Sequence, residues 1–246
     1  MPQEILGVIP ARYGSSRFPG KALAPLAGKT VLQHVWEGAS RARCLTRLVI
    51  ATDDERILEE ARRFGAAARM TSAVHRSGTD RVAEVAAEDG AAVVVNIQGD
   101  EPLIDPGAID AAVSGLLESA PIPMGTLKKR IDDRNELSNP NVVKVVTDRA
   151  GHALYFSRSM IPFVRSETAC HYKHIGLYVY RRDFLLGYPR LKVGPLEEAE
   201  KLEQLRALEN GYRIRVVETG YESLGVDTPE DLKRVSDLVE SRRPAT

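Results

Sequence analysis

The feature that most constrains the fold of this chain is an apolar run near its start that leads directly into a basic, glycine-rich loop. Residues 5–9 (ILGVI) have the length and β-branched content of a buried strand. Pro10 predicts the end of that strand, because proline cannot donate a ladder hydrogen bond. The loop that follows combines glycines, hydroxyls and cations, namely Arg12, Gly14, Ser15, Ser16, Arg17, Gly20 and Lys21. A strand that ends in such a loop at the start of an α/β sheet is a usual place for nucleotide phosphates.

The loop belongs to neither of the two common phosphate-binding motifs. Five residues rather than four separate Gly14 from Gly20, and Ala22 rather than Ser or Thr follows Lys21, so it is not a Walker A motif. The sequence also contains no G-x-G-x-x-G dinucleotide fingerprint. The alternative is an exposed loop whose charges are merely solvated. The close backbone approach that glycines permit, together with several charge-assisted donors, favours an anion-binding loop.

Composition and charge limit the possible partners. The chain has 246 residues, and its 34 basic and 34 acidic side chains cancel, so no global field attracts nucleic acid or an anionic membrane. No apolar run approaches the length of a membrane span, and no signal peptide precedes the first strand. We therefore expect a cytoplasmic protein without membrane or nucleic-acid partners. Cys44 and Cys170 lack C-x-x-C spacing and are expected to be reduced thiols.

Apolar periodicity in the first half predicts a Rossmann-like, doubly wound and mainly parallel α/β sheet. Thr30 is the expected N-cap of the first helix, and Gly65 is expected to stop the second. A further helix begins at Ser77 or Thr79 and ends near residue 88. The expected strands cover residues 5–9, 48–52, 67–70 and 93–97, and the other helices cover residues 31–43, 55–64 and 106–119.

Two carboxylates, Asp100 and Glu101, follow the unbroken apolar run 93–97, which predicts a central strand. Carboxylates at the carboxyl end of such a strand are well placed to hold a divalent cation. The alternative is a turn that favours Gly, Asp and Pro for backbone reasons.

After residue 120 the pattern changes to successive strands with short turns, which predicts an antiparallel or mixed extension. A helix is expected over residues 195–209. Thr228 and Pro229 predict the start of the final helix, and Asp227 precedes this cap without a helical role, so it is a ligand candidate. The expected strands of this half cover residues 124–129, 142–147, 153–157, 174–180 and 214–218.

Eight segments, in the same order along nearly the whole chain, resemble the 3-deoxy-manno-octulosonate cytidylyltransferases, also called CMP-Kdo synthetases. They are IPARYGSSRFPGK (9–21), HRSGTDR (75–81), VNIQGDEP (95–102), NPNVVKVV (139–146), ALYFSRSMIP (153–162), KHIGLYVYR (173–181), PLEEAEKLEQLR (195–206) and GVDTPEDL (225–232). The resemblance implies a fold of the nucleotide-diphospho-sugar transferase type in one domain over 1–246. Within it, 1–120 would mainly bind CTP, 121–212 would form a sugar-binding and dimerisation extension, and 213–246 would return to the main sheet.

The resemblance implies transfer of a cytidylyl group from CTP to the anomeric 2-hydroxyl of 3-deoxy-D-manno-octulosonate (Kdo), with release of pyrophosphate. It further implies Mg²⁺ as cofactor, a homodimer and a role in lipopolysaccharide biosynthesis. Arg12 and Lys21 would hold the β- and γ-phosphates, and Asp100 and Asp227 would bind Mg²⁺. The number of metal ions stays open, and no side chain is nominated as a general base.

The resemblance also implies which residues bind each substrate. For the nucleotide they are Ala11, Arg12, Gly14, Ser15, Ser16, Lys21, Arg76, Ser77, Gly78, Thr79, Arg81 and Gln98. For the sugar acid they are Gln98, Arg158, His174, Tyr178, Glu203 and Gln204. Without the resemblance, Tyr178 on a strand is typical of a core residue, and Glu203 and Gln204 are typical of a solvated helix face.

Two other functions are considered. The first is a cytidylyltransferase for another acidic sugar, such as a sialic acid or an amino variant of Kdo. The second is a non-catalytic nucleotide-binding regulator, which requires loss of a cation or carboxylate. Arg12, Lys21, Asp100 and Asp227 are all present, so the sequence favours an enzyme.

Overall fold

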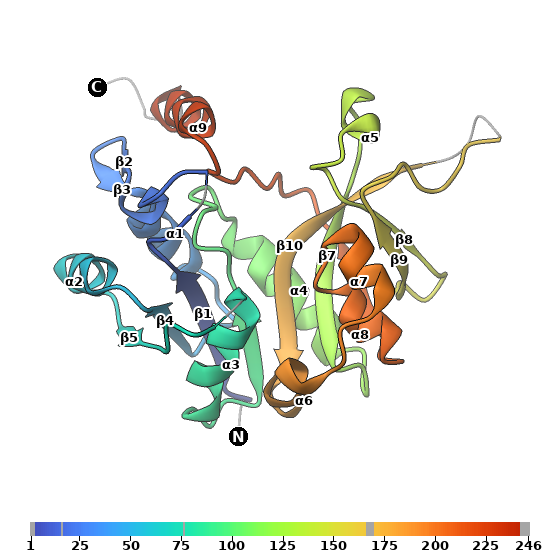
Figure 1. Cartoon of the computed structure of the whole chain (residues 1–246), viewed down its shortest axis with the longest axis horizontal. Helices are drawn as coiled ribbons and strands as arrows, with labels where there is room; N and C mark the ends of the chain where they lie inside the picture. Colours follow the sequence, from blue (N-terminus) through green and yellow to red (C-terminus); the bar gives the residue numbers. More distant parts are fainter. Residues whose placement is uncertain (1–2, 16, 76, 166–169, 242–246) are drawn as a thin grey trace. The chain divides into compact units, whose positions relative to one another are not determined.

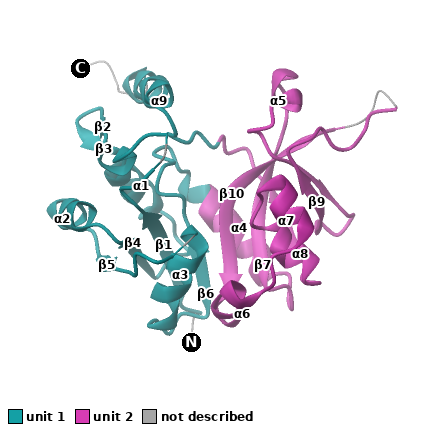
Figure 2. Ribbon diagram, in the orientation of Figure 1, with its two compact units in different colours: residues 1–107, 223–246 teal, residues 108–222 magenta. Residues whose placement is uncertain are grey.

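The computed structural model describes residues 3–15, 17–75, 77–165 and 170–241. The chain divides into two compact units, drawn in teal and magenta in Figure 2. The first unit comprises Met1–Gly107 and Ser223–Thr246, and the second comprises Ala108–Glu222. Figure 1 gives the labels of the helices and strands within each unit.

The first unit is built on a four-stranded parallel sheet whose central strand is β1 (Ile5–Ala11). One neighbour of β1 is β6 (Val93–Asn96), and the other is β4 (Arg47–Thr52), which also pairs with β5 (Ala68–Met70). The apolar side chains of β6 and most of those on β1 and β4 are buried, as expected for a parallel sheet covered on both faces, whereas Met70 on the edge strand β5 is exposed. This arrangement confirms the predicted parallel α/β core.

Local capping chemistry sets the helix starts of the first unit. Thr30 Oγ1 accepts a hydrogen bond from Gln33 N (3.2 Å), and Ser77 and Asp80 form a reciprocal capping box. The helices are α1 (Val31–Ala39), α2 (Glu55–Arg63), α3 (Gly78–Ala87) and α9 (Pro229–Ser241), accompanied by the short elements η1 (Lys21–Leu23), β2 (Pro25–Leu26) and β3 (Lys29–Thr30).

The expectation that Pro10 ends the first strand is wrong, because β1 continues to Ala11. In a parallel strand, alternate residues present their backbone groups to the same neighbour. Val8 O accepts from Ile97 N (2.9 Å) on the side of β6, so the missing N–H of Pro10 lies on that same side. The pairing with β6 has already ended there, at Val8 and Asn96. Proline therefore removes no ladder hydrogen bond.

The second unit is built around β7 (Met124–Arg130). It pairs antiparallel with β10 (Tyr172–Arg181) and parallel with β11 (Ile214–Glu218). A hairpin of β8 (Lys144–Thr147) and β9 (Ala153–Ser157) adjoins β10 through Lys144 and Lys173. The predicted mixed extension is thereby confirmed. The other elements are α4 (Pro106–Leu117), which begins in the first unit, α5 (Asn135–Ser138), α6 (Arg182–Gly187) and η2 (Tyr188–Arg190).

The single helix predicted over 195–209 is wrong. The structure has α7 (Pro195–Glu200) and α8 (Leu205–Glu209), separated by residues 201–204, the first of which, Lys201, has a left-handed φ of 52°. Side chains from elsewhere in the unit donate hydrogen bonds to the backbone carbonyl oxygens at this break. The Arg158 guanidinium donates to two of them, and Tyr188 OH donates to Glu203 O (2.6 Å). These tertiary contacts outweigh the helical periodicity of the sequence.

Within the described ranges, no helix combines the length and the apolar content needed to cross a bilayer. The predicted division of roles between 1–120, 121–212 and 213–246 is functional and stays a prediction. In the structure β11 pairs with a strand of the second unit, whereas α9 belongs to the first.

Candidate active site

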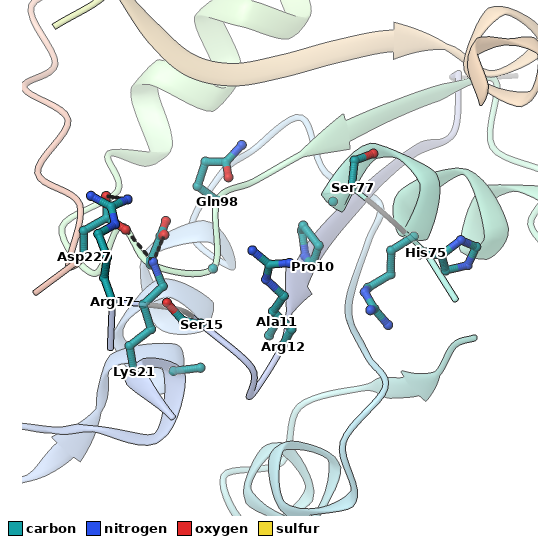
Figure 3. A pocket seen from close by; sticks show the side chains of 15 residues that line it. Pro10, Ala11, Arg12, Ser15, Arg17, Lys21, His75, Ser77, Gln98 and Asp227 are labelled. Carbon is teal, nitrogen blue, oxygen red and sulfur yellow. Dashed lines mark hydrogen bonds and ion pairs between the residues drawn. The ribbon is translucent and has the colours of Figure 1, made fainter. Parts of the chain in front are cut away.

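A cavity of about 310 Å³ opens in the first unit, at the carboxyl ends of β1 and β6 (Figure 3). This is the edge at which open parallel sheets bind ligands. The lining comes from the end of β1, the opening loop, the start of α3, the turn after β6 and the segment before α9: Pro10, Ala11, Arg12, Ser15, Arg17, Lys21, Ala22, His75, Ser77, Gly78, Arg81, Gln98, Gly99, Asp100 and Asp227.

Most of the predicted nucleotide and catalytic residues meet in this cavity. All four predicted catalytic residues line it, and so do Ala11, Ser15, Ser77, Gly78, Arg81 and Gln98. Gly14 and Thr79 are described but are not among its lining residues. Ser16 and Arg76 lie outside the described residues, so their predicted roles are not placed.

The opening loop is closed on itself by backbone hydrogen bonds. Tyr13 O accepts from both Ser15 N (3.0 Å) and Gly20 N (2.9 Å). Gly20 has a left-handed φ of 75°, and a Cβ there would lie 3.0 Å from the Tyr13 ring. The Arg56 guanidinium covers that ring at 3.3 Å from its centroid. The loop is therefore held in a turn that leads straight into η1, which begins at Lys21.

The turn after β6 approaches β1 more closely than a side chain would allow. A Cβ at Gly99 would lie 2.6 Å from the backbone oxygen of Pro10. Glycine at this position lets the ends of the two strands meet and brings the turn that carries Gln98 and Asp100 to the cavity.

Lys21 lies between the two predicted metal ligands. Its Nζ is 2.5 Å from Asp100 Oδ2 and 2.8 Å from Asp227 Oδ1. Arg17 Nη2 contacts the second oxygen of Asp227 at 2.9 Å. Asp100 and Asp227 therefore converge on one lysine, and their counter-ions in the structure are the cationic side chains of the opening loop. Figure 3 shows Arg17, Lys21 and Asp227 side by side.

Asp227 is held in place by its own segment. Val226 N donates to Asp100 O (2.8 Å), which ties the segment directly to the turn after β6. Thr228 caps α9 by accepting from Asp231 N (3.2 Å), and Asp231 Oδ2 accepts from the backbone N of Thr228 (3.1 Å) and of Asp227 (3.2 Å). The cap thus uses the backbone of Asp227 and leaves its carboxylate to the cavity.

The ion pairs shift the ionisation of both partners toward their charged forms. Burial alone lowers the pKa of Lys21, but the charges and hydrogen bonds of Asp100 and Asp227 outweigh it and raise this pKa above its usual value. Burial alone raises the pKa of Asp227, but hydrogen bonds and charges from Lys21 and Arg17 hold this pKa below its usual value. Both groups are charged at neutral pH.

The donor set around the cavity is compatible with Mg²⁺ carried by a nucleotide. In the described part of the chain, no group of three or more His, Cys, Asp or Glu side chains could enclose a metal ion. Mg²⁺ commonly binds through one or two carboxylates and completes its shell with substrate phosphates and water. Asp100 and Asp227 supply two such carboxylates on the wall of a cavity that is also lined by basic side chains.

Arg81, which also lines the cavity, is anchored by two residues that the sequence did not predict as site residues. Its guanidinium donates to Asp53 Oδ2 (2.8 Å) and to Thr71 Oγ1, and only 4% of Arg81 is exposed. His75, which also lines the cavity, hydrogen-bonds Glu84 through Nε2. The guanidinium of Arg81 is therefore held rigidly in the wall of the cavity by its partners.

Several lining residues were not predicted as site residues. Arg17 and His75 belong to segments that the sequence singled out, and Gly99 precedes Asp100 directly. Their positions within or beside those segments were the only sequence evidence that they belong to the site. The ion pair of Arg17 with Asp227 shows that Arg17, like Lys21, is a counter-ion of this carboxylate.

The predicted sugar-binding residues other than Gln98 lie in the second unit. The rings of His174 and Tyr178 have centroids 5.3 Å apart, and His174 Nε2 lies 3.0 Å from Thr126 Oγ1. Burial lowers the pKa of His174 to about 3, so its imidazole is neutral at pH 7. Burial and the negative charge of Glu203 raise the pKa of Tyr178, so its hydroxyl keeps its proton.

Gln204 and Arg158 differ in how their polar groups are used. Only 4% of Gln204 is exposed, and its Nε2 has no hydrogen-bond partner among the described residues. The Arg158 guanidinium donates to the backbone oxygens of Pro140, Glu200 and Lys201. The structure thus gives Arg158 a supporting role that the sequence did not indicate.

Comparison with known proteins agrees with this geometry. A family model described as Cytidylyltransferase matches residues 6–214. A protein of Solibacter usitatus named 3-deoxy-manno-octulosonate cytidylyltransferase is 67% identical over 97% of this chain and 95% of its own length. A protein of the same name from Geobacter metallireducens is 57% identical over 94% of this chain and 96% of its own length.

A solved structure of CMP:2-keto-3-deoxy-manno-octonic acid synthetase, complexed with CTP, is also similar. Its TM-score is 0.95 at 42% identity, and the match covers 98% of this chain and 100% of that one. A 4-diphosphocytidyl-2C-methyl-D-erythritol synthase from Anaerococcus prevotii, at 13% identity and a TM-score of 0.66, shares the fold alone. The fold and these matches define a nucleotidyltransferase. The chain belongs to the 3-deoxy-manno-octulosonate cytidylyltransferase family.

Proposed function

We propose that this protein transfers CMP from CTP to the anomeric 2-hydroxyl of Kdo, giving CMP-Kdo and pyrophosphate. The observation that carries the proposal is the meeting of Arg12, Lys21, Asp100 and Asp227 in one cavity of a chain whose relatives bear the Kdo name. The sugar oxygen forms a bond to the α-phosphorus while the bond from the α-phosphorus to the bridging oxygen breaks. Pyrophosphate leaves with that oxygen, and the hydroxyl proton passes to solvent.

The residues of the cavity act by position and charge, because phosphoryl transfer asks little covalent chemistry of the protein. Arg12 and Lys21 bind the β- and γ-phosphates and neutralise the charge that develops on the departing pyrophosphate. Asp100 and Asp227 hold Mg²⁺, which when bound supplies positive charge to phosphate oxygens and lowers the pKa of a coordinated hydroxyl. For Lys21 this role requires that it leave the two carboxylates and turn to the phosphates.

The sugar-side residues supply donors and acceptors for a polyhydroxylated acid. Neutral His174 and protonated Tyr178 can each donate a hydrogen bond, and Glu203 can accept from sugar hydroxyls. The unpartnered Nε2 of Gln204 is a buried donor of the kind that a ligand satisfies. Gln98 is proposed to contact both substrates.

Three further parts of the proposal rest on family resemblance rather than on contacts within the molecule. They are the use of the product in lipopolysaccharide biosynthesis, assembly as a homodimer, and a cytoplasmic location. A cytidylyltransferase for a different acidic sugar is not favoured, because the relatives described above share the Kdo name over nearly their full length.

The test is incubation of the protein with CTP, Mg²⁺ and a sugar acid, with pyrophosphate release as the readout. Kdo, a sialic acid and amino-Kdo are compared at equal concentration, and the product is identified by phosphorus NMR. We expect turnover with Kdo. Turnover with the sialic acid and none with Kdo would overturn the proposal.

A further inference from the structure

The sequence segment NPNVVKVV (139–146) has no role in the chemistry described above, yet it contains one of the most buried charges of the molecule. Lys144 has no exposed surface. Its ammonium donates to three backbone oxygens, those of Val142 (2.6 Å), Arg158 (2.7 Å) and Asn139 (2.9 Å). A buried ammonium is tolerated only when its donors are satisfied, and these three bonds use all of them. Lys144 therefore joins the turn before β8 to the end of β9.

Arg158 extends the same connection to α7. Its Nη1 donates back to Pro140 O (2.9 Å), within the turn that Lys144 holds. Its Nε donates to Glu200 O (2.7 Å), and its Nη2 donates to Lys201 O (3.4 Å). Two cations thus gather the carbonyls of three segments that are far apart in the sequence.

The carboxylate of Glu200 closes this arrangement from the opposite direction. Glu200 Oε1 accepts from Ser157 Oγ (2.6 Å), and Oε2 accepts from Arg158 N (2.9 Å). The end of β9 and the end of α7 are consequently joined by both backbone and side-chain bonds. The left-handed Lys201 comes directly afterwards, and the chain then turns through Glu203 and Gln204.

We propose that Lys144 is a positioning residue for the sugar acid, and that it acts through Arg158 and Glu200 to fix the break between α7 and α8. The inference rests on the proposed function. The break carries Glu203 and Gln204, whose Nε2 is unpartnered among the described residues, and both side chains would have to meet the ligand at set distances and angles. Misplacement of such contacts by about 1 Å can cost about a hundredfold in rate. In this account Arg158 supports the site rather than serving only as a partner of the sugar carboxylate.

The test is steady-state kinetics of Lys144→Met with CTP and Kdo varied in turn. We expect the KM for Kdo to rise about tenfold or more while the KM for CTP changes by less than about twofold. The matched control is Lys173→Met. Lys173 is also a buried lysine of the second unit, but its ammonium pairs with Glu136 and Glu222. This control is expected to lower stability and leave the KM for Kdo unchanged.

Two milder variants keep the inference testable if Lys144→Met does not fold. Ser157→Ala and Glu200→Gln each weaken the connection without removing the buried ammonium, and each should raise the KM for Kdo selectively. An unchanged KM for Kdo in the folded variants, or an equal rise for both substrates, would overturn the inference. Failure of the wild-type protein to use Kdo would instead overturn the proposed function, so the two failures are distinguishable.

Discussion

The ammonium of Lys21 lies 2.8 Å from Oδ1 of Asp227, a residue 206 positions further along the chain. The same ammonium contacts Asp100, so a single lysine connects the opening loop, the turn after β6 and the segment before α9. The two carboxylates and the lysine form one ionic cluster. A divalent ion at the carboxylates would replace the ammonium as their counter-ion, and the lysine would then be released to the phosphates.

The first prediction concerns Lys21→Gln, which should have two opposite effects. Turnover should fall about a hundredfold, because the leaving pyrophosphate loses one stabilising charge. Mn²⁺ binding in the absence of nucleotide should become tighter, because the carboxylates no longer hold a competing cation. Steady-state assays measure the first effect, and electron paramagnetic resonance of free Mn²⁺ measures the second.

The control for this prediction is Lys29→Gln, which removes an exposed lysine paired with Glu37. It should leave both turnover and Mn²⁺ binding unchanged. If Lys21→Gln lowers turnover while Mn²⁺ affinity stays at the wild-type value, the competition between lysine and metal is refuted, although the phosphate role of Lys21 survives.

The second prediction concerns the pH dependence of stability at Asp227. Its pKa in the folded protein lies below the ordinary value of 3.8, so its pairing stabilises the protein at neutral pH. That contribution is lost as the pH falls through the depressed pKa. The difference in free energy of unfolding between wild type and Asp227→Asn should therefore shrink below about pH 4. Urea titrations at several pH values would measure it, and a constant difference would contradict the ion pairing.

The third prediction concerns Gly99→Ala. The added methyl group would lie 2.6 Å from the backbone oxygen of Pro10, which cannot withdraw without moving β1. Overpacking of this kind typically costs about 1–3 kcal/mol of unfolding free energy, and the displaced turn should also weaken CTP binding. Calorimetry of CTP binding and urea denaturation test both effects. Gly90→Ala is the control, since a Cβ there meets no atom within 4 Å.

The fourth prediction concerns the ion pair of Arg206 and Glu197, which joins α8 to α7 by two bonds of 2.6 and 2.8 Å. Both side chains are nearly buried, with 13% and 11% exposed. Arg206→Met should cost about 3–5 kcal/mol of unfolding free energy, because Glu197 is left as an uncompensated buried charge. The double variant Glu197→Gln/Arg206→Met should recover most of that loss. A double variant as unstable as the single one would show that packing, not charge, dominates.

Much of the fold could be predicted from the sequence because its signals are local. Thr30 and Ser77 cap their helices through neighbouring backbone groups, and the apolar runs of β1 and β6 are long enough to identify buried strands. The errors arose where distant residues decide the outcome. Pro10 is accommodated because β6 ends beside it, and the helix after residue 195 breaks because Arg158 and Tyr188 take its carbonyls.

The candidate site likewise contains residues that could be predicted from local sequence and residues that depend on distant contacts. The opening loop and Asp100 could be predicted because each follows a strand directly, and Asp227 could be suspected because a cap does not require it. The pairing of Lys21 with both carboxylates could not be predicted, since no local rule relates positions so far apart. Lys144 was missed for a different reason. A lysine within a β-branched strand suggests an exposed side chain, and only the structure shows that three carbonyls surround it.

The position of Asp227 just before α9 has a consequence for folding during translation. Lys21 is synthesised 206 residues before its partner Asp227, which corresponds to a delay of about 10–40 s at roughly 5–20 residues per second. During that time the nascent chain can assemble the parallel strands of the first unit, but Lys21 has only Asp100 to pair with. The cavity gains its second carboxylate only when the late segment folds back, so an interrupted translation product lacks the carboxylate of Asp227 in this cavity.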